Sequence, residues 1–212
     1  MPRGAGRHEV IQRILKAALE LFAEKGFTAA TTEEIAARAG VNKAMLYYYV
    51  GSKEELFTAA VLRQLAPARE TVAGVLHMPV PPQEKLRLLQ GAFARLMAKS
   101  PHLPRLMLRM LATEVERIPK PVLEAMAEVF AATAQTVQEG VKAGALRPTN
   151  SFVAHLLLVG SLALACEASK LVQRVAACGL LPVPEAFPPV ETAAEAISEI
   201  LLYGLVNEGR TP

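Results

Sequence analysis

The chain contains no aspartate, and all of its acidic residues are glutamates. EF-hand calcium sites and most magnesium-dependent phosphoryl-transfer enzymes rely on aspartate ligands, so the composition argues against both classes. Only two cysteines, Cys166 and Cys178, are present, and they lie in apolar surroundings. Because a disulfide framework or a zinc site needs more thiols at closer spacing, we expect reduced cysteines in or near the core and no bound metal or other cofactor.

Strand-like alternation of apolar and polar residues is also lacking, and glycines and prolines gather between periodic stretches. Hydrophobic residues make up 52% of the chain and charged residues 20%, which is enough apolar surface for a folded core. No signal peptide is recognisable, and the longest apolar run, Phe152 to Cys166, is too short to span a membrane. We therefore expect an all-α cytoplasmic protein that does not bind membranes.

Apolar residues at helical spacing predict a first helix that buries one face. Lys25 and Gly26 predict its end, with the glycine in a left-handed conformation. Further helices are predicted over residues 53–76, with a bend favoured at Pro67, and over 83–99, 102–117, 120–143, 150–177 and 189–207, between clusters of proline and glycine. The apolar face of the first helix comprises Ile11, Ile14, Leu15, Ala18 and Phe22.

Residues 31–56 read TTEEIAARAGVNKAMLYYYVGSKEEL and carry three helix-start signals. Thr31 with Glu34, and Ser52 with Glu55, have the spacing of a capping box, and Asn42 can cap a short helix between them. Gly40 permits the positive φ of a sharp turn. Two short helices joined by a tight glycine turn, with a supporting helix on each side, indicate a helix-turn-helix over about residues 31–50.

The second short helix has a polar face suited to nucleic acid. Lys43 can pair with phosphate, while Tyr47 and Tyr48 can donate hydroxyl hydrogen bonds to phosphate and pack on sugar. Ala44 and Met45 are small or apolar enough to approach bases and thymine methyl groups. The alternative is that the three consecutive tyrosines, Tyr47 to Tyr49, only cover the core; this alternative weighs most for Tyr49.

The charge distribution agrees with a polyanion-binding module at the N-terminus. Residues 1–53 carry eight Lys and Arg residues against five Glu, whereas the remaining residues carry equal numbers of each sign. The whole net charge of +3 therefore lies in the first quarter of the chain, and this bias favours contact with nucleic acid.

This stretch resembles the DNA-binding region of the TetR family of transcriptional regulators. The family pattern has a Thr-capped helix, then Ala-Gly-Val-Ser-Lys, Leu-Tyr-x-(His/Tyr)-Phe and Ser-Lys-Glu-Glu-Leu, preceded by Phe-x-x-x-Gly-Phe; here Asn42 replaces the serine and Val50 the last phenylalanine. About a quarter of the chain is covered. The resemblance implies DNA contacts, and our full set of candidate contacts is Thr31, Thr32, Asn42, Lys43, Ala44, Met45, Tyr47, Tyr48, Tyr49 and Lys53.

The resemblance also implies the architecture: a three-helix DNA-binding domain over residues 1–52 and a six-helix domain for effector binding and dimerisation over residues 53–212. The residues favour a homodimer independently, because the helix at 150–177 has two apolar faces and the last helix carries small and branched residues. The alternative is a monomer whose own hydrophobic core is large enough to bury both apolar faces. The predicted dimer contacts are Leu157, Ser161, Leu164, Ala193, Ile197, Ile200 and Gly204.

The middle helices are rich in methionine, which indicates either ordinary core filling or an adaptable apolar pocket. We expect the pocket to take a small, largely apolar effector such as an acyl or aromatic compound. Arg109 and Glu114 are additional candidates for groups that orient this ligand. The predicted pocket residues are Phe93, Met97, Met107, Met110, Met126, Phe130 and His155.

These features predict a repressor that binds a palindromic operator in double-stranded DNA as a homodimer and is released by its effector. One alternative is an all-helical enzyme that uses His155 with Glu167 or Glu114, although the sequence has no nucleophile elbow, phosphate loop or metal-ligand spacing. The other is a helical adaptor that docks on proteins through the tyrosine-bearing helix. Salt-dependent binding to duplex DNA separates the three.

Overall fold

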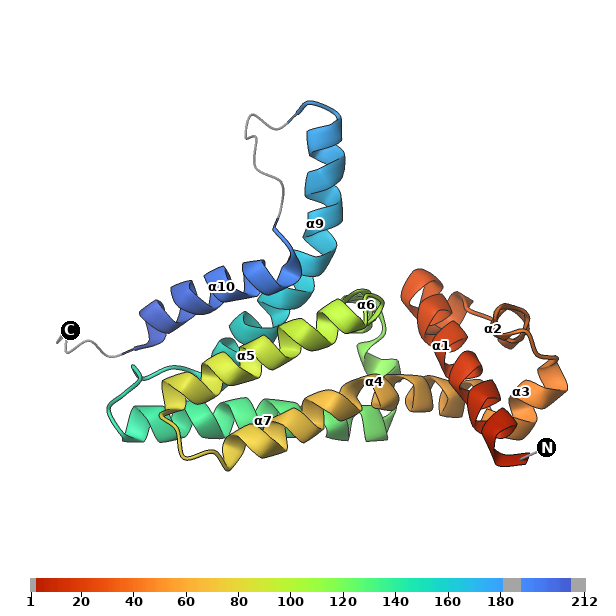
Figure 1. Cartoon of the computed structure of the whole chain (residues 1–212), viewed down its shortest axis with the longest axis horizontal. Coiled ribbons are helices and arrows are strands. Elements are labelled where there is room, and N and C mark those ends of the chain that lie inside the picture. Colours follow the sequence, from red (N-terminus) through yellow and green to blue (C-terminus); the bar gives the residue numbers. More distant parts are fainter. Residues whose placement is uncertain (1–2, 181–187, 207–212) are drawn as a thin grey trace. The chain divides into compact units, whose positions relative to one another are not determined.

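The computed structural model describes residues 3–180 and 188–206, and it is helical almost throughout these residues (Figure 1). The described part of the chain contains no β-strand, only an isolated antiparallel bridge between Leu146 and Val206. The prediction of an all-α fold is therefore confirmed. In chain order the elements are α1 (Arg3–Ala29), α2 (Thr32–Ala39), α3 (Lys43–Val50), α4 (Lys53–Leu76), α5 (Pro82–Lys99), α6 (Leu103–Thr113), the 3-10 helix η1 (Val115–Arg117), α7 (Lys120–Lys142), α8 (Ser151–His155), the π-helix η2 (Leu156–Gly160), α9 (Ser161–Ala177) and α10 (Val190–Leu205).

The chain divides into two compact units. The first comprises residues 1–66 and 105–125, and the second comprises residues 67–104 and 126–212. The boundary falls inside α4, α6 and α7, so each of these helices contributes residues to both units. If α8, η2 and α9 are taken as one helix, six α-helices follow α3 in the described residues, as predicted. A functional division at residue 52 stays a prediction.

In the first unit, α1 and α2 pack together and α3 packs on both. The predicted apolar face of α1 is buried at Ile14, Leu15, Ala18 and Phe22, and Ile11 is half-buried. Three aromatic rings meet beside it: the Phe22 and Phe57 centroids are 5.0 Å apart, and those of Phe27 and Phe57 are 5.2 Å apart. This aromatic cluster ties the end of α1 to the start of α4.

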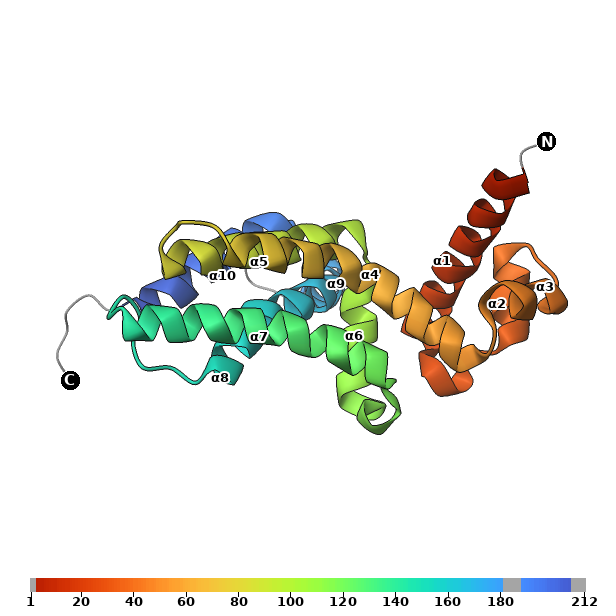
Figure 2. The same ribbon diagram turned by 90° about the horizontal axis from the view of Figure 1, so that it is seen from below.

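In the second unit, α10 packs along α5, and both views show α5, α7 and α10 in one bundle (Figures 1 and 2). Gly140 lets α7 approach its neighbours closely, because a Cβ there would lie 2.4 Å from Leu146 Cδ1 and 3.1 Å from Pro82 Cβ. The core of this bundle consists of Leu86, Val137, Leu146, Ala154, Leu158, Leu202 and Leu205.

Residues Ser151–Ala177 form one helix of 27 residues, with the π-helical turn η2 inside it. By length and composition this helix could cross a membrane, with a mean hydropathy of 1.7 over its most apolar 18 residues. The helix predicted over 150–177 is thus confirmed, but the expectation that it is too short to span a membrane rested on the run Phe152 to Cys166 alone, which is shorter than this apolar window. Only 28% of that apolar stretch is buried within the structure, so the helix leaves apolar surface uncovered.

Two further expectations need correction. The helix predicted over 102–117 ends at Thr113, because the chain leaves the α-helical path at Glu114 (φ −135°, ψ 17°) before the short η1 turn. Cys178 is exposed rather than part of the core, whereas Cys166 is half-buried; no disulfide joins them. The helix predicted over 53–76 is confirmed as α4, Lys53–Leu76, with Pro67 inside it.

Candidate nucleic-acid interface

Local capping interactions fix both helices of the helix-turn-helix. Thr31 Oγ1 accepts a hydrogen bond from Glu34 N at 3.2 Å, and Glu34 Oε2 accepts one from Thr31 N at 3.1 Å. Asn42 Oδ1 accepts a hydrogen bond from Met45 N at 2.8 Å, so it caps α3 as expected. These bonds satisfy backbone N–H groups that helix starts leave without partners, and they therefore define where α2 and α3 begin.

The turn between the helices depends on Gly40, which has φ 66° and ψ 39°. In this left-handed conformation Gly40 N donates to Ala37 O at 3.2 Å and Val41 N donates to Ala36 O at 3.0 Å. A residue with a Cβ would be strained at this φ. The predicted glycine turn is confirmed.

The helices meet through side chains that are small or fully buried. Ile35 and Leu46 are both 0% exposed, and Ala36 and Ala39 are also buried. Because Leu46 anchors α3 from its inner side, residues at other positions around this short helix must face outward. Burial of these side chains therefore determines which sides of α2 and α3 face the core.

The outer face of α3 presents the predicted polar and aromatic residues to solvent. Tyr48 is 75% exposed and Tyr47 44%, and Asn42, Lys43 and Ala44 are also exposed. Large aromatic side chains are rarely left this open without a partner surface. Met45 and Tyr49 are half-buried at the edges of the same face. We call this surface, Asn42 to Tyr48 with Tyr49 at its edge, the α3 outer face.

Lys43 does not stand alone on this face, because its ammonium pairs with the Glu33 carboxylate of α2. This contact raises the pKa of Lys43 and lowers the pKa of Glu33. Both side chains are more than half exposed, so the pair is open to exchange with an external anion. The sequence prediction did not include Glu33 in the site.

The tyrosines are held by neighbours from α1 and α2. Tyr47 Oη lies 3.3 Å from Oγ1 of the buried Thr32, and Tyr48 packs edge-on against Tyr49 with centroids 5.2 Å apart. The Arg7 guanidinium lies 5.8 Å from the centre of the Tyr49 ring, a cation–π distance. Arg7 is therefore a further cation at the edge of the α3 outer face.

Lys53 has a different environment from Lys43. Its Nζ donates to Thr28 O at 3.3 Å and lies 4.7 Å from the centre of the Phe27 ring, at the end of α1. Ser52 and Glu55 cap the start of α4 beside it, through Ser52 N to Glu55 Oε2 at 2.7 Å and Glu55 N to Ser52 Oγ at 3.2 Å. An ammonium group has three donors, so one contact leaves Lys53 able to bind phosphate as well.

The residues predicted for an effector pocket fall in both units. Met107 and Met110 belong to the first unit, and Phe93, Met97, Met126, Phe130 and His155 belong to the second. None of the seven lines either of two pockets in the described structure, one of about 600 Å³ beside Thr28 and residues 111–117 and one of about 430 Å³ between α5 and α10. Phe93, Met97 and Met110 are buried, and the other four are half-buried.

His155 and Gln90 are the polar groups of note in the interior of the second unit. His155 Nδ1 lies 3.1 Å from Thr133 Oγ1, its ring packs edge-on against Phe130, and burial lowers its pKa. Gln90 is 1% exposed, and both polar atoms of its amide lack a hydrogen-bond partner in the structure. The sequence prediction missed Gln90, because a glutamine on an amphipathic helix gives no signal of burial.

The predicted dimer contacts lie on α8–α9 and α10, mostly at the surface. Leu164 is 61% exposed and Ile200 72%; Leu157 and Gly204 are also exposed, and Ser161 and Ile197 are half-buried. Ala193 is only 6% exposed, so it packs mainly within its own chain. The structure adds large exposed apolar side chains on the same helices that were not predicted: Phe152, Val153, Leu156, Leu171 and Tyr203.

No group of three or more metal-ligating side chains occurs among residues 3–180 and 188–206. The polar groups suggested for catalysis are engaged elsewhere: both Glu114 carboxylate oxygens accept from Phe27 N, and Glu167 pairs with Lys170 at 2.6 Å. The candidate site in the first unit is therefore the α3 outer face.

Comparison with known proteins points to the same region. Residues 14–60 match the family described as bacterial regulatory proteins, tetR family. The chain is 38% identical over 76 residues to the HTH-type transcriptional repressor NicS of Pseudomonas putida, which is 36% of each chain. It is 37% identical over 87 residues to the HTH-type transcriptional activator FasR of Mycolicibacterium smegmatis, which is 41% of this chain and 40% of FasR. The chain thus spans well under half the length of these relatives.

A solved structure shares the fold over most of the chain. The transcriptional regulator FadR from Bacillus subtilis, in complex with stearoyl-CoA, superposes with a TM-score of 0.67, covering 91% of this chain and 98% of that chain. The two sequences are 17% identical, so the likeness concerns the fold alone.

The capping box of α2 generates a test of the local electrostatics. The Lys25 ammonium, followed by the Thr31 backbone N–H, lowers the pKa of Glu34 to about 2 from its ordinary value of 4.5. Because this pKa is depressed in the fold, the ionised carboxylate stabilises the protein above pH 4.5, and that contribution is lost as the pH falls from about 4.5 to about 2. We expect the Glu34 carboxyl carbon to titrate near pH 2 by NMR.

The variant Lys25→Ala should move this titration midpoint upward. Glu55 is the internal control, since its pKa is lowered by the Ser52 N–H and hydroxyl, and its midpoint should stay where it is in the wild type. A Glu34 midpoint that does not respond to the loss of Lys25 would show that this ion pair is absent in solution.

Proposed function

Because the chain belongs to the TetR family of bacterial regulatory proteins, we propose that it is a sequence-specific DNA-binding regulator of transcription. The observation that supports this most strongly is the exposure of Lys43, Tyr47 and Tyr48 on a helix that is anchored by the fully buried Leu46. Phosphate contacts from the lysine and the phenols would position α3 in the major groove, with Ala44 and Met45 nearest the base edges.

The Lys43–Glu33 pair gives this interface a defined exchange step. In the free protein, Glu33 is the anion that neutralises Lys43. On binding, a DNA phosphate takes the place of the carboxylate, and Glu33 is left facing a polyanion. The pair therefore opposes non-specific binding, because only a phosphate held in the right place compensates for the loss of Glu33.

We propose further that two copies of the chain bind one palindromic operator. Each recognition helix would enter a major groove, and the two grooves of one operator lie about 34–36 Å apart. The exposed apolar side chains of α8–α9 and α10 supply a surface for the second copy. Exposed large apolar side chains in such number are typical of interaction surfaces. We call this set the α9–α10 face: Phe152, Leu156, Leu157, Leu164, Leu171, Ile200 and Tyr203.

A lipid bilayer is the other environment that could cover the exposed apolar side chains of the helix Ser151–Ala177. Three charged residues, Glu167, Lys170 and Arg174, lie in the second half of the helix. Charges at membrane depth are costly, whereas at the edge of a protein interface they stay in water. We therefore propose a second copy as the occupant and a cytoplasmic location for the regulator.

The proposed effector is a small, largely apolar molecule bound in the interior of the second unit. The likeness in fold to FadR, which was solved with stearoyl-CoA, agrees with an acyl or aromatic ligand. In this chain, Phe93, Met97 and Phe130 would contact the apolar part. The unpaired amide of Gln90 and the imidazole of His155, which its lowered pKa keeps neutral, would meet an uncharged polar group.

We propose repression as the direction of regulation, with the effector releasing the protein from its operator. The relatives include both a repressor, NicS, and an activator, FasR, so a transcription assay on the regulated promoter decides the sign. Release requires that the effector bind the DNA-free conformation more tightly, by a coupling of typically 1–3 kcal/mol.

The DNA-binding proposal is tested by Lys43→Ala, with Lys120→Ala as the matched control. Both variants remove one exposed lysine of the first unit, and Lys120 lies on α7 beside Glu124. With duplexes selected by the wild type from a random pool, Lys43→Ala should weaken binding to all sequences alike. The slope of log Kobs against log salt should become shallower by about 0.9, the value for one lost phosphate contact.

Glu33→Gln should have the opposite effect and tighten binding, because Lys43 is then no longer shared with a carboxylate. Fluorescence anisotropy over a salt series measures all three variants. If Lys43→Ala binds as the wild type does, or if the Lys120 control loses as much affinity, the α3 outer face is not the DNA-binding surface. Binding of protein partners without any duplex would favour an adaptor instead.

The dimer proposal is tested by Leu164→Glu, with Leu111→Glu as the control. Both leucines are more than half exposed, but only Leu164 lies on the α9–α10 face. In a symmetric dimer this substitution would bury two negative charges, one from each copy, with no positive charge to compensate them, which is strongly unfavourable. Leu164→Glu should therefore be monomeric in sedimentation equilibrium at concentrations where the wild type is a dimer. A dimer that survives Leu164→Glu, or that Leu111→Glu also dissociates, places the interface elsewhere.

A further inference from the structure

Three side chains, one from α6, one from the residue that follows α6 and one from η1, contact the end of α1. Glu114 accepts hydrogen bonds from Phe27 N, at 2.9 Å to Oε1 and 3.2 Å to Oε2. Arg109 Nη2 donates to Glu24 O at 3.1 Å, and Arg117 donates to the Thr28 hydroxyl. All of these residues belong to the first unit. We call this arrangement the α1–α6 latch, defined by Arg109, Glu114 and Arg117.

The latch acts on backbone groups that a break in α1 sets free. Gly26 has φ 82° and ψ 171°, outside the helical region, although helical hydrogen bonding resumes directly after it. Such a break removes the intrahelical partners of nearby N–H and C=O groups, and buried groups of this kind need other partners. The part-buried Phe27 N finds its partner in the Glu114 carboxylate.

Any other residue at Gly26 would displace side chains of the latch from their present positions. A Cβ there would lie 2.7 Å from Glu114 Oε1 and 3.2 Å from Arg109 Cδ. The positive φ would strain an L residue as well. The bend and the latch thus depend on each other. Gly26 leaves space for the Glu114 and Arg109 side chains, and Glu114 accepts the hydrogen bond of the Phe27 N–H at the bend.

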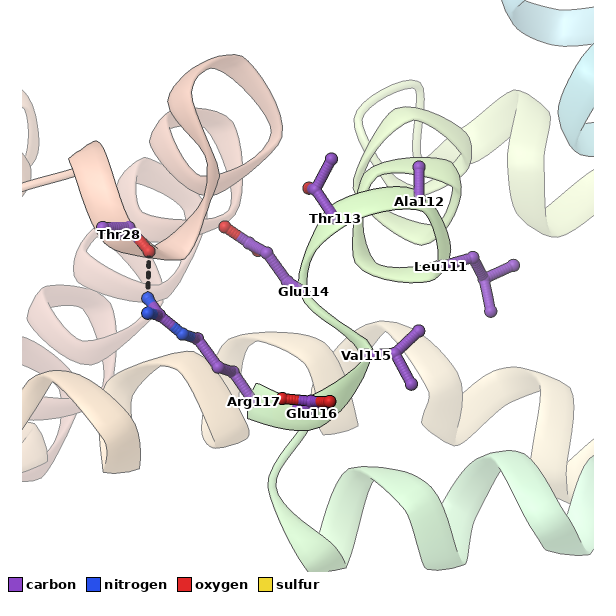
Figure 3. A pocket seen from close by; sticks show the side chains of 8 residues that line it. All are labelled: Thr28, Leu111, Ala112, Thr113, Glu114, Val115, Glu116 and Arg117. Atoms are coloured by element: carbon purple, nitrogen blue, oxygen red, sulfur yellow. Dashed lines mark hydrogen bonds between the residues drawn. The ribbon is translucent and has the colours of Figure 1, made fainter.

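The segment held by the latch leads directly into the helix-turn-helix. Phe27 stacks on Phe22 and packs edge-on against Phe57, in the core of the first unit. Four residues after Phe27, Thr31 caps α2. Figure 3 shows Glu114 and Arg117 pointing toward the end of α1, with the Arg117–Thr28 hydrogen bond drawn, beside the pocket of about 600 Å³ that these residues line.

We propose that Glu114 is a positioning residue for operator recognition: it fixes the bend at Gly26 and thereby the orientation of α2 and α3 on α6. This inference rests on the proposed DNA-binding function. The role of Arg109 and Glu114 is then to hold α1 rather than to orient a ligand, the role for which the sequence made them candidates.

The experiment compares Glu114→Ala, Glu114→Gln and Glu116→Ala on two DNA probes. One probe is a full duplex selected by the wild type from a random pool, and the other is a single half-site of it. Glu116 lines the same pocket as Glu114 without a hydrogen bond to α1 in the described contacts, so it is the matched control. Circular dichroism melting confirms that each variant is folded at the temperature of the binding assay.

If Glu114 positions α2 and α3, Glu114→Ala weakens binding to the full duplex about tenfold or more and leaves the affinity for the half-site within about twofold of the wild type. The two helix-turn-helix units of a dimer bind both half-sites at once only when their spacing matches that of the half-sites. A misplaced helix-turn-helix therefore loses the extra affinity that the second half-site provides. Glu114→Gln should recover most of the affinity, since its amide oxygen can accept from Phe27 N. Glu116→Ala should match the wild type on both probes.

Arg117→Ala is a milder second variant should Glu114→Ala fold poorly, and it should shift binding in the same direction by a smaller factor. The inference is overturned if Glu114→Ala binds the full duplex as the wild type does. It is also overturned if both probes are weakened by the same factor, which is the result of mere destabilisation. If the wild type binds no duplex at all, the proposed DNA-binding function itself is wrong. That result is distinct from the two outcomes that overturn only the role of Glu114.

Discussion

The complete burial of Leu46 is the constraint on which the DNA-binding face depends. With Ile35 and Leu46 both fully buried, one on each side of the Gly40 turn, α3 has only one possible inner side. A short helix of eight residues then has to display Lys43, Tyr47 and Tyr48 to solvent. Replacing the packed leucine with a smaller or polar side chain would free α3 to rotate, and the outer face would lose its definition.

Around this anchor, the first unit supplies partners that hold the outer side chains before any ligand arrives. Glu33 holds Lys43, Thr32 contacts the Tyr47 hydroxyl, and Arg7 lies by the Tyr49 ring. Side chains that are already ordered lose less conformational entropy on binding. The latch extends the same principle from side chains to a whole helix, because it fixes the place where the chain enters α2.

Local features of this structure were predictable from the sequence. The Thr31–Glu34 box, the Asn42 cap, the Ser52–Glu55 box and the Gly40 turn each depend on residues within four positions of one another. Their geometry follows from local hydrogen bonds and local backbone conformation, and all four are confirmed. The helical ranges were predicted well for the same reason, since apolar periodicity and proline clusters act over one or two turns.

Features that depend on distant parts of the chain were not predictable. The contact between Glu114 and Phe27 joins residues 87 positions apart, and nothing near Glu114 in the sequence indicates it. The end of α6 at Thr113 has no glycine or proline signal, and Cys178 lies on a helix end whose exposure only tertiary packing decides. Which residues bind DNA, effector or a second copy stays a prediction drawn from placement and chemistry.

NMR mapping of the amide resonances during titration with a selected duplex tests the central claim most directly. The account predicts that the largest shifts fall on Asn42 to Tyr48 and on Thr31 to Glu33, while α5 and α7 show little direct effect. It also predicts that the shifts shrink as salt is added, because phosphate contacts release counterions. Shifts confined to other helices, or a spectrum unchanged by duplex DNA in dilute buffer, would contradict it.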